Sequence, residues 1–528
     1  MGGSPGRDPD LAGDPVPLRR DRPAPPPLGG EVTKGTGGTP RAGRSARRLA
    51  ALLSLLAAVV ATPAGWAATG DPNRGRELYD RRCAPCHGVK GDGNGPAAEL
   101  LDPRPRDFTT GVFKIRTTST KAPSDQDLLA VITNGMPGTY MPPWGELSET
   151  DRRNVVAYIK AFAPDRFKEA PTPQALPPVV RASPESVKRG REMFEAIECN
   201  KCHGTEGRAD GPSRSELKDD WGRPIKPANL TKRWTFRGGP APEDIAMRLA
   251  TGVNGTPMPS FIDSVEKPED IWHLANYVAS LGPASPNYAT LVTAEAVRSA
   301  LPGDPNADFW TTIAPENIAL VGQVTVDPRN VNPAVDMVAV RAAYNDREIA
   351  FHLTWDDATQ STPDPAKHVY ADAVSVQFPV TVGAGPERPY FLMGDDAEGV
   401  YLLRWENGKG ATEATANGPT KITPMTASEV TGTAVFRNGQ YRLVLKRARV
   451  RKDAPAFAPG VFVPIAFQAW DGGAGETGPK MSLTSWYYLR LEEPQSNRRF
   501  VVPPLVALLT VAAMALIVRT ARRWTRNV

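Results

Sequence analysis

Cysteine is scarce in this chain, whose 528 residues include only four cysteines and five histidines. All four cysteines fall in two copies of one short pattern, Cys83-Ala84-Pro85-Cys86-His87 and Cys199-Asn200-Lys201-Cys202-His203. No thiol is left over for a structural disulfide. A zinc cluster is also disfavoured, because it would need further cysteine or histidine ligands close to each pair.

The pattern C-x-x-C-H is the attachment motif of c-type haem. Its two thiols reach the two vinyl positions of one porphyrin, and the imidazole that follows becomes the proximal iron ligand. The sequence therefore predicts two covalent haems. The residues expected to hold them are, in chain order, Cys83, Cys86, His87, Cys199, Cys202 and His203.

Positive charge is lacking in the body of the chain, although the formal net charge is +5. Residues 1–67 carry a net charge of +4 and six arginines after residue 497 carry +6, which leaves −5 for residues 68–497. A mildly acidic body argues against a nucleic-acid partner.

Apolar periodicity is missing from residues 1–45, which are rich in Pro, Gly and Arg and are expected to be disordered. Arg47 and Arg48 then precede an apolar run, 49–61, which small residues follow as far as Ala67. This order is typical of a secretory signal with cleavage near Ala67. An uncleaved anchor is the alternative, which the shortness of the run disfavours.

The two motifs lie in two copies of one larger plan, predicted as all-α domains at 68–165 and 185–285 with a Pro-rich linker at 166–184. A Gly and an aromatic residue precede each motif, and a closing apolar helix ends each copy, at 151–162 and 270–281. The first cysteine and a later Met-Pro are separated by 58 residues in one copy and by 59 in the other. Agreement this close across a variable loop indicates two homologous domains.

These features resemble the class I cytochromes c, in which an N-terminal and a C-terminal helix cross and a Met-Pro loop lies between them. The resemblance implies that Met141 and Met258 are the distal iron ligands. Met136 competes for the role in the first domain, but Met141 aligns with Met258 in Gly-Thr-x-Met-Pro. Ligation by His and Met fills both axial positions and raises the potential, so such haems carry electrons and leave no open substrate site.

Long helical runs are absent from residues 300–497, where short alternating segments predict a β-sandwich. Residues 349–355 place Ile349, Phe351, Leu353 and Trp355 on one face. Asn438-Gly439 between two such segments predicts a hairpin.

This third domain resembles the haem b subunit of ethylbenzene dehydrogenase and of the related dimethylsulfide, selenate and chlorate enzymes. The resemblance rests on residues 371–378, 389–395, 401–405, 463–472 and 480–486. It implies one non-covalent haem b held by Met393 and Lys480. It also implies a partner, a molybdopterin oxidoreductase with an iron–sulfur subunit. Without the resemblance, Met393 reads as a core residue and Lys480 as an exposed one.

Charge is absent from residues 500–518, a run of 19 residues that is long enough to span a bilayer as a helix. Four arginines follow it, and the positive-inside rule places this tail, 519–528, in the cytoplasm. Together with the signal, this predicts that the body lies on the periplasmic side of a bacterial inner membrane.

The sequence thus favours a membrane-anchored, non-catalytic electron-transfer subunit of an oxidoreductase complex over an enzyme in its own right. Haem b would exchange electrons with the molybdopterin partner, and the c haems with other cytochromes or a terminal oxidase. The alternative is a dihaem cytochrome c tethered to a ligand- or carbohydrate-binding β-sandwich without haem b. A peroxidase would need a haem that can open, and a quinol dehydrogenase anchor would need His in its span. The remaining histidines, His273, His352 and His368, are not expected to be ligands.

Overall fold

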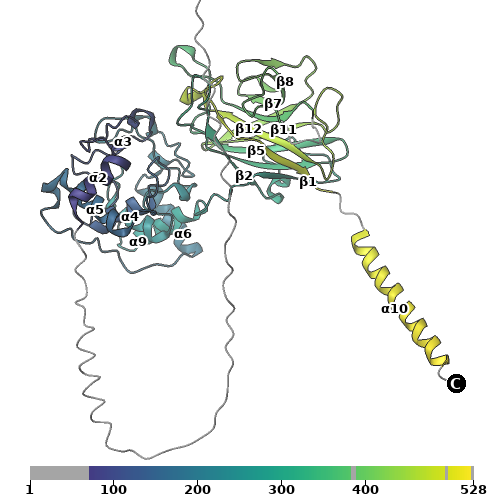
Figure 1. Ribbon diagram of the computed structural model, residues 1–528, viewed down its shortest axis with the longest axis horizontal. Coiled ribbons are helices and arrows are strands. Elements are labelled where there is room, and N and C mark those ends of the chain that lie inside the picture. The colour runs from purple at the N-terminus through teal and green to yellow at the C-terminus, as the bar shows by residue number, and fades with distance from the viewer. Residues whose placement is uncertain (1–69, 382–387, 494–497, 525–528) are drawn as a thin grey trace, which may run out of the picture. The chain divides into compact units, whose positions relative to one another are not determined.

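The computed structural model describes residues 70–381, 388–493 and 498–524 (Figure 1). The expected disordered extension and signal peptide lie outside these residues. The described chain contains two helical domains, a β domain and a C-terminal helix, which confirms the predicted fold class.

The first helical domain contains α2 (Pro72–Arg82), α3 (Ala84–His87), α4 (Asp125–Asn134) and α5 (Glu149–Ala161), with short 3₁₀ turns η1 (Ala98–Leu100) and η2 (Pro164–Phe167). The helix starts follow from the sequence. The Asp71 side chain accepts a hydrogen bond from the Asn73 backbone N–H at the start of α2, and Ser148 caps α5 in the same way. Each cap satisfies a backbone donor that a helix end leaves unpaired.

The second helical domain repeats this order with α6 (Pro184–Ala196), α7 (Asn200–His203), α8 (Pro242–Thr251) and α9 (Asp270–Ser280), together with η3 (Arg214–Glu216) and η4 (Arg233–Thr235). In both domains the helix before the motif crosses the closing helix, and a glycine lies at the crossing. A β-carbon on Gly75 would lie 2.0 Å from the Asn154 carbonyl oxygen, and one on Gly190 would lie 2.0 Å from that of His273. Only glycine permits this approach.

The β domain contains fourteen strands in the described part of the chain, which pair in the order β10-β11-β5-β4-β1-β14-β12-β6-β7-β8-β9, with β2, β3 and β13 as side branches. Their bounds are β1 (Leu291–Ala296), β2 (Glu316–Ala319), β3 (Val321–Gly322), β4 (Met337–Tyr344), β5 (Glu348–Asp356), β6 (Ala373–Pro379), β7 (Val400–Glu406), β8 (Gly410–Ala416), β9 (Ile422–Pro424), β10 (Thr431–Arg437), β11 (Gln440–Ala448), β12 (Phe462–Trp470), β13 (Ser482–Leu483) and β14 (Tyr487–Leu491). Three 3₁₀ turns, η5 (Asp308–Thr312), η6 (Pro365–Lys367) and η7 (Gly472–Ala474), connect them.

Strand β12 joins the two layers, because its first half pairs with β14 and its second half with β6. The layers share one apolar core, in which the rings of Phe351 on β5 and Phe378 on β6 lie 5.9 Å apart. This is the predicted sandwich. Its first strand begins at Leu291, ahead of the expected boundary at 300, and pairs in parallel with β4 and β14.

The predicted hairpin at Asn438-Gly439 is confirmed between β10 and β11. Both turn residues have positive φ, 49° and 69°, as a two-residue turn of this hairpin type requires. The C-terminal helix α10 (Arg498–Trp524) includes a segment, Val501–Trp524, that is long and apolar enough to cross a membrane, with a mean hydropathy of 2.5 over an 18-residue window.

Candidate haem sites

In both helical domains the histidine of the C-x-x-C-H motif contacts a backbone carbonyl oxygen through Nδ1. His87 Nδ1 lies 3.0 Å from the Arg106 carbonyl oxygen, and His203 Nδ1 lies 2.8 Å from that of Ala228. A carbonyl only accepts, so Nδ1 carries the proton and Nε2 keeps its lone pair for a metal. Burial lowers the pKa of both imidazoles and favours this neutral form.

The first thiol of each motif lies at the N-cap of a short helix, Cys83 at that of α3 and Cys199 at that of α7. Cys83 caps the C-terminus of α2, and its backbone N–H donates to the Tyr79 carbonyl. Burial raises the pKa of the Cys83 thiol to about 12 and that of Cys199 to about 11. Both thiols therefore sit in apolar surroundings, as attachment to a porphyrin edge requires.

An apolar pocket brings Cys83, His87 and Met141 together in the first domain. The other lining residues are Leu78, Arg82, Phe108, Ile132, Trp144, Leu147, Val155 and Ile159. A thiol, an imidazole with a free Nε2 and a thioether within one apolar pocket fit a covalent haem with His/Met ligation. Met136 is not among the lining residues.

The loops that carry Met141 and Met258 share one backbone hydrogen bond. The Met136 N–H donates to the Met141 carbonyl at 3.0 Å, and the Val253 N–H donates to the Met258 carbonyl at 3.1 Å. Val253 therefore occupies the position of Met136 in the second domain, and valine has no ligand atom. Met141 and Met258 are the equivalent pair.

A cavity of about 470 Å³ lies where the first helical domain meets the second. The Arg106 guanidinium stacks on the Trp221 ring at 4.5 Å and donates to the Asn254 carbonyl oxygen at 3.4 Å. Lys114 also lines the cavity and makes no ion pair within the described chain, and burial with Arg237 and Arg106 lowers its pKa to about 7. The half-buried side chains of Arg106 and Lys114 could serve as donors to the propionates of a haem held by His87. Sequence reasoning missed this cavity, because Trp221 and Arg106 are 115 positions apart.

Met393 and Met481, the residue after Lys480, belong to one apolar cluster of the β domain. Met393 is fully buried at φ 60°, in an apolar cluster that also contains Trp470 and Met481. Lys480 precedes Met481 in a turn and is half-buried, and its Nζ lies 3.4 Å from the Ala474 carbonyl oxygen. The positive φ of Met393 is rare for a residue with a side chain and marks a constrained loop.

The other histidines have ordinary roles. His352 is buried, its Nε2 lies 3.0 Å from the Pro305 carbonyl oxygen, and its ring stacks on Trp310. His368 is exposed, as expected for a loop. His273 is half-buried on α9, and its Nδ1 lies 2.9 Å from the Ser186 hydroxyl across the helix crossing.

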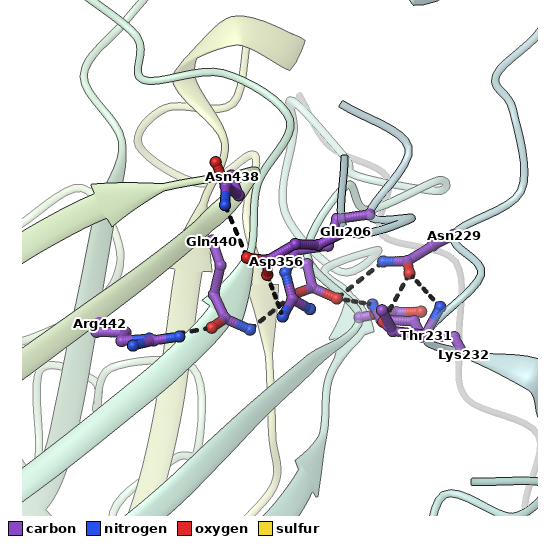
Figure 2. A network of polar contacts seen from close by, with 10 residues as sticks. Glu206, Asn229, Thr231, Lys232, Asp356, Asn438, Gln440 and Arg442 are labelled. Atoms are coloured by element: carbon purple, nitrogen blue, oxygen red, sulfur yellow. Dashed lines mark hydrogen bonds and ion pairs between the residues drawn. The ribbon is translucent and has the colours of Figure 1, made fainter. Parts of the chain in front are cut away.

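A network of polar side chains joins the second helical domain to the β domain (Figure 2). Asp356, at the end of β5, lies at its centre. It accepts hydrogen bonds from Asn229 Nδ2 at 2.8 Å, Gln440 Nε2 at 3.1 Å and Arg208 at 3.4 Å. Glu206 accepts one from Asn438 Nδ2 at 2.7 Å.

Lys232 contributes the buried positive charge of this network (Figure 2). It pairs with Asp336 and lies 3.9 Å from Asp356. Burial alone would lower the pKa of Lys232, but the two carboxylates raise it. The charged form is therefore kept inside the contact between the domains.

Comparisons with known proteins agree with this geometry. Family models match residues 70–159 (cytochrome c oxidase, cbb3-type, subunit III), 187–282 (cytochrome c) and 307–428 (ethylbenzene dehydrogenase). Cytochrome c55X of Paracoccus denitrificans is 34% identical over 119 residues, 21% of this chain and 92% of that protein. The chain therefore belongs to the c-type cytochromes. More particularly, it is a cytochrome c with two such domains and a third domain of the ethylbenzene dehydrogenase type.

Two longer similarities each cover 41% of the chain. A Haloferax mediterranei protein named "Putative respiratory nitrate reductase heme subunit ORF7" is 25% identical over 221 residues, 41% of this chain and 76% of that protein. A chain of the Kuenenia stuttgartiensis reducing HAO-like protein complex Kustc0457/Kustc0458 is 40% identical and covers 41% of this chain and 98% of its own length, with a TM-score of 0.39.

Proposed function

We propose that this chain is the haem subunit of a respiratory oxidoreductase and relays electrons between a partner enzyme and other carriers. The observation that carries the proposal is the pocket in which His87 and Met141 meet, repeated in backbone geometry around His203 and Met258. With both axial positions taken by protein side chains, a site exchanges electrons and has no position for a substrate.

The roles of the residues follow from this proposal. Cys83, Cys86, Cys199 and Cys202 would hold two haems covalently, and each bound haem would supply one-electron chemistry. The Arg106 and Ala228 carbonyls hold the protons of the two imidazoles at Nδ1, which fixes the ring orientation. The aromatic and aliphatic lining would exclude water from a haem bound in this pocket.

A non-covalent haem b in the β domain, with Met393 and Lys480 as ligands, is the finer part of the proposal. The family match at residues 307–428 includes Met393, and the proposal is supported by the apolar cluster that contains both Met393 and Met481, the residue after Lys480. An amine binds iron only through its lone pair, so Lys480 would have to be neutral and leave the Ala474 carbonyl.

The partner is proposed to be a molybdopterin oxidoreductase with an iron–sulfur subunit, which docks at the β domain. The c domains would then serve other cytochromes or a terminal oxidase. The similarity to a protein named as a respiratory nitrate reductase haem subunit supports an oxidoreductase partner. Helix α10 would anchor the chain in the inner membrane, with the body on the periplasmic side.

Carbon monoxide tests the function class. The dithionite-reduced protein in detergent should keep its spectrum under carbon monoxide, because no axial position is open at the c sites. Met141→Ala should open one site and produce the spectrum of a carbon monoxide complex. A wild-type c haem that binds carbon monoxide readily would indicate a peroxidase or a sensor and would overturn the proposal.

A further inference from the structure

Three buried carboxylates from distant parts of the β domain converge on one point. Asp357 follows β5, Asp372 precedes β6 and Asp471 follows β12, and all three residues are buried. One carboxylate oxygen from each lies within 4.8 Å of the other two. Residues Ala373 and Trp470 are register partners, which explains why Asp372 and Asp471 meet.

The three carboxylates differ in the number of hydrogen bonds that they accept. Asp372 is fully engaged, because it accepts from the Gly472 N–H, the Ser361 N–H and the Tyr441 hydroxyl at 2.7–2.8 Å. Asp357 is only 4% exposed, yet its Oδ2 has no hydrogen-bond partner in the described chain. An unpaired buried carboxylate oxygen is costly unless a cation or a proton satisfies it.

Positive charge from the protein does not reach the cluster. No lysine, arginine or histidine among the described residues lies within ion-pair distance of the three carboxylates. Arg214 of the second helical domain acts on Asp357 only from a distance, and burial together with Asp471 and Asp372 raises the pKa of Asp357. The site therefore has an excess of negative charge that the chain itself leaves uncompensated.

Neutral oxygen atoms complete a cradle around the cluster. The hydroxyls of Thr359 and Ser361 lie 3.2 Å apart. A β-carbon on Gly473 would lie 2.6 Å from Thr359 Oγ1, 2.9 Å from Ser361 Oγ and 3.2 Å from Asp471 Oδ1. A side chain at residue 473 would crowd these oxygens, so glycine leaves them room to converge.

We propose that Asp357, Asp372 and Asp471 bind a calcium ion, with Thr359 and Ser361 as neutral oxygen ligands. Ca²⁺ takes about six to eight oxygen ligands in a flexible arrangement, and this donor set is made of oxygen alone. Zinc and copper prefer nitrogen or sulfur donors, which the described residues around the cluster do not offer. The ion fastens the ends of β5, β6 and β12 to one another.

The proposed ion also supports the contact with the second helical domain. Asp356 and Asp357 are consecutive at the end of β5, and Asp356 binds Asn229 and Arg208 (Figure 2) while Asp357 joins the cluster. An ion that fixes Asp357 fixes the backbone that carries Asp356. Removal of the ion should loosen this contact as well as the sandwich.

Calcium analysis on the full-length, haem-loaded protein in detergent tests the proposal. After exchange into chelator-treated buffer with micromolar free calcium, mass spectrometry of the elements should find one calcium per chain. EGTA should lower the Tm by several degrees, and added CaCl₂ should restore it. Asp357→Asn should lose the calcium and the EGTA response, whereas Asp396→Asn, an exposed carboxylate of the same domain, should keep both.

Two results would overturn the proposal. One is wild-type protein without stoichiometric calcium whose Tm does not respond to EGTA or CaCl₂. The other is an Asp357→Asn variant that is more stable than wild type in EGTA and equally stable in calcium, which would show that the carboxyl groups share protons. If Asp357→Asn fails to fold, the wild-type titration still decides.

Discussion

The Asn229 side-chain amide donates a 2.8 Å hydrogen bond to Asp356, which ties the proximal loop of the second c site to the β domain (Figure 2). Asn229 directly follows Ala228, whose carbonyl lies 2.8 Å from His203 Nδ1. Two hydrogen bonds and one peptide unit therefore connect the candidate iron ligand with the end of β5. The first c site is tied to the β domain on its distal side instead, because the hydroxyl of Tyr140, one residue before Met141, donates a 2.5 Å hydrogen bond to the Val331 carbonyl oxygen.

Asp356→Ala tests this connection. Loss of the carboxylate leaves Asn229 Nδ2 without its partner, takes one of two carboxylates from Arg208, which keeps Glu206, and removes one of the two acids beside Lys232. We expect a loss of roughly 3 kcal/mol in the free energy of unfolding. We also expect a higher potential for one c haem, since a nearby negative charge is lost and the hold on His203 weakens. Redox titration should show the other c haem unchanged, and unchanged potentials together with an unchanged Tm would refute the connection.

The distal ligand of the first domain is tested by a matched pair of variants. Met141→Leu should remove the sulfur-to-iron absorption band of one haem and lower its potential, because a thioether stabilises ferrous iron. Met136→Leu should leave both properties intact. If the two variants exchange these outcomes, Met136 is the ligand and the correspondence with Met258 fails.

A single methyl group added where α6 crosses α9 is expected to destabilise the second helical domain. In Gly190→Ala the β-carbon would lie 2.0 Å from the His273 carbonyl oxygen, so α6 and α9 must separate. We expect a destabilisation of about 1–3 kcal/mol, or failure to mature. Gly303→Ala is the control, because a β-carbon there meets nothing within 4 Å. Equal thermal stability of the two variants would contradict the observed packing.

His352 should make the β domain sensitive to acid. Burial, with Arg341 and Arg442 nearby, lowers the pKa of His352 from 6.5 to about 4. The unfolded chain therefore binds a proton that the folded chain rejects. Stability is complete above about pH 6.5 and falls as the pH drops toward 4, by up to about 3 kcal/mol. Denaturant unfolding at pH 7.5 and 5 should show this loss in wild type and not in His352→Gln. His368→Asn, at an exposed position, should behave as wild type.

The outline of the helical domains could be predicted from the sequence because its signals are local and repeated, but α4 and α8 lie in the segments expected to be loops and were missed. The motifs, the glycine at each crossing and the Met-Pro loop recur at matched spacing, so one copy checks the other. Less of the β domain could be predicted, because most of its strand pairings are not local. Its hairpin at Asn438-Gly439 is local, but β1 pairs in parallel with β4 and β14, and no pattern within 291–296 specifies partners so far along the chain.

The prediction of sites was limited in the same way, because their residues are far apart in the sequence and meet only in the folded chain. Asp357, Asp372 and Asp471 span more than a hundred positions, and only the pairing of β6 with β12 brings them together. The cavity with Arg106 and Trp221 arises from two domains that were considered separately. Met393 and Lys480 came from a family resemblance, and the geometry of the Lys480 amine does not follow from residue type.

Haem content tests the central claim most directly, because the relay requires a b haem in addition to two c haems. Acid–acetone extraction of the purified full-length protein, followed by pyridine haemochrome spectra of both fractions, gives the ratio. We expect two haems to stay with the protein for each haem extracted, and Lys480→Ala to lose the extractable haem or its low-spin spectrum. Two covalent haems without any extractable haem would contradict the relay and leave the β-sandwich as a binding module beside a dihaem cytochrome c.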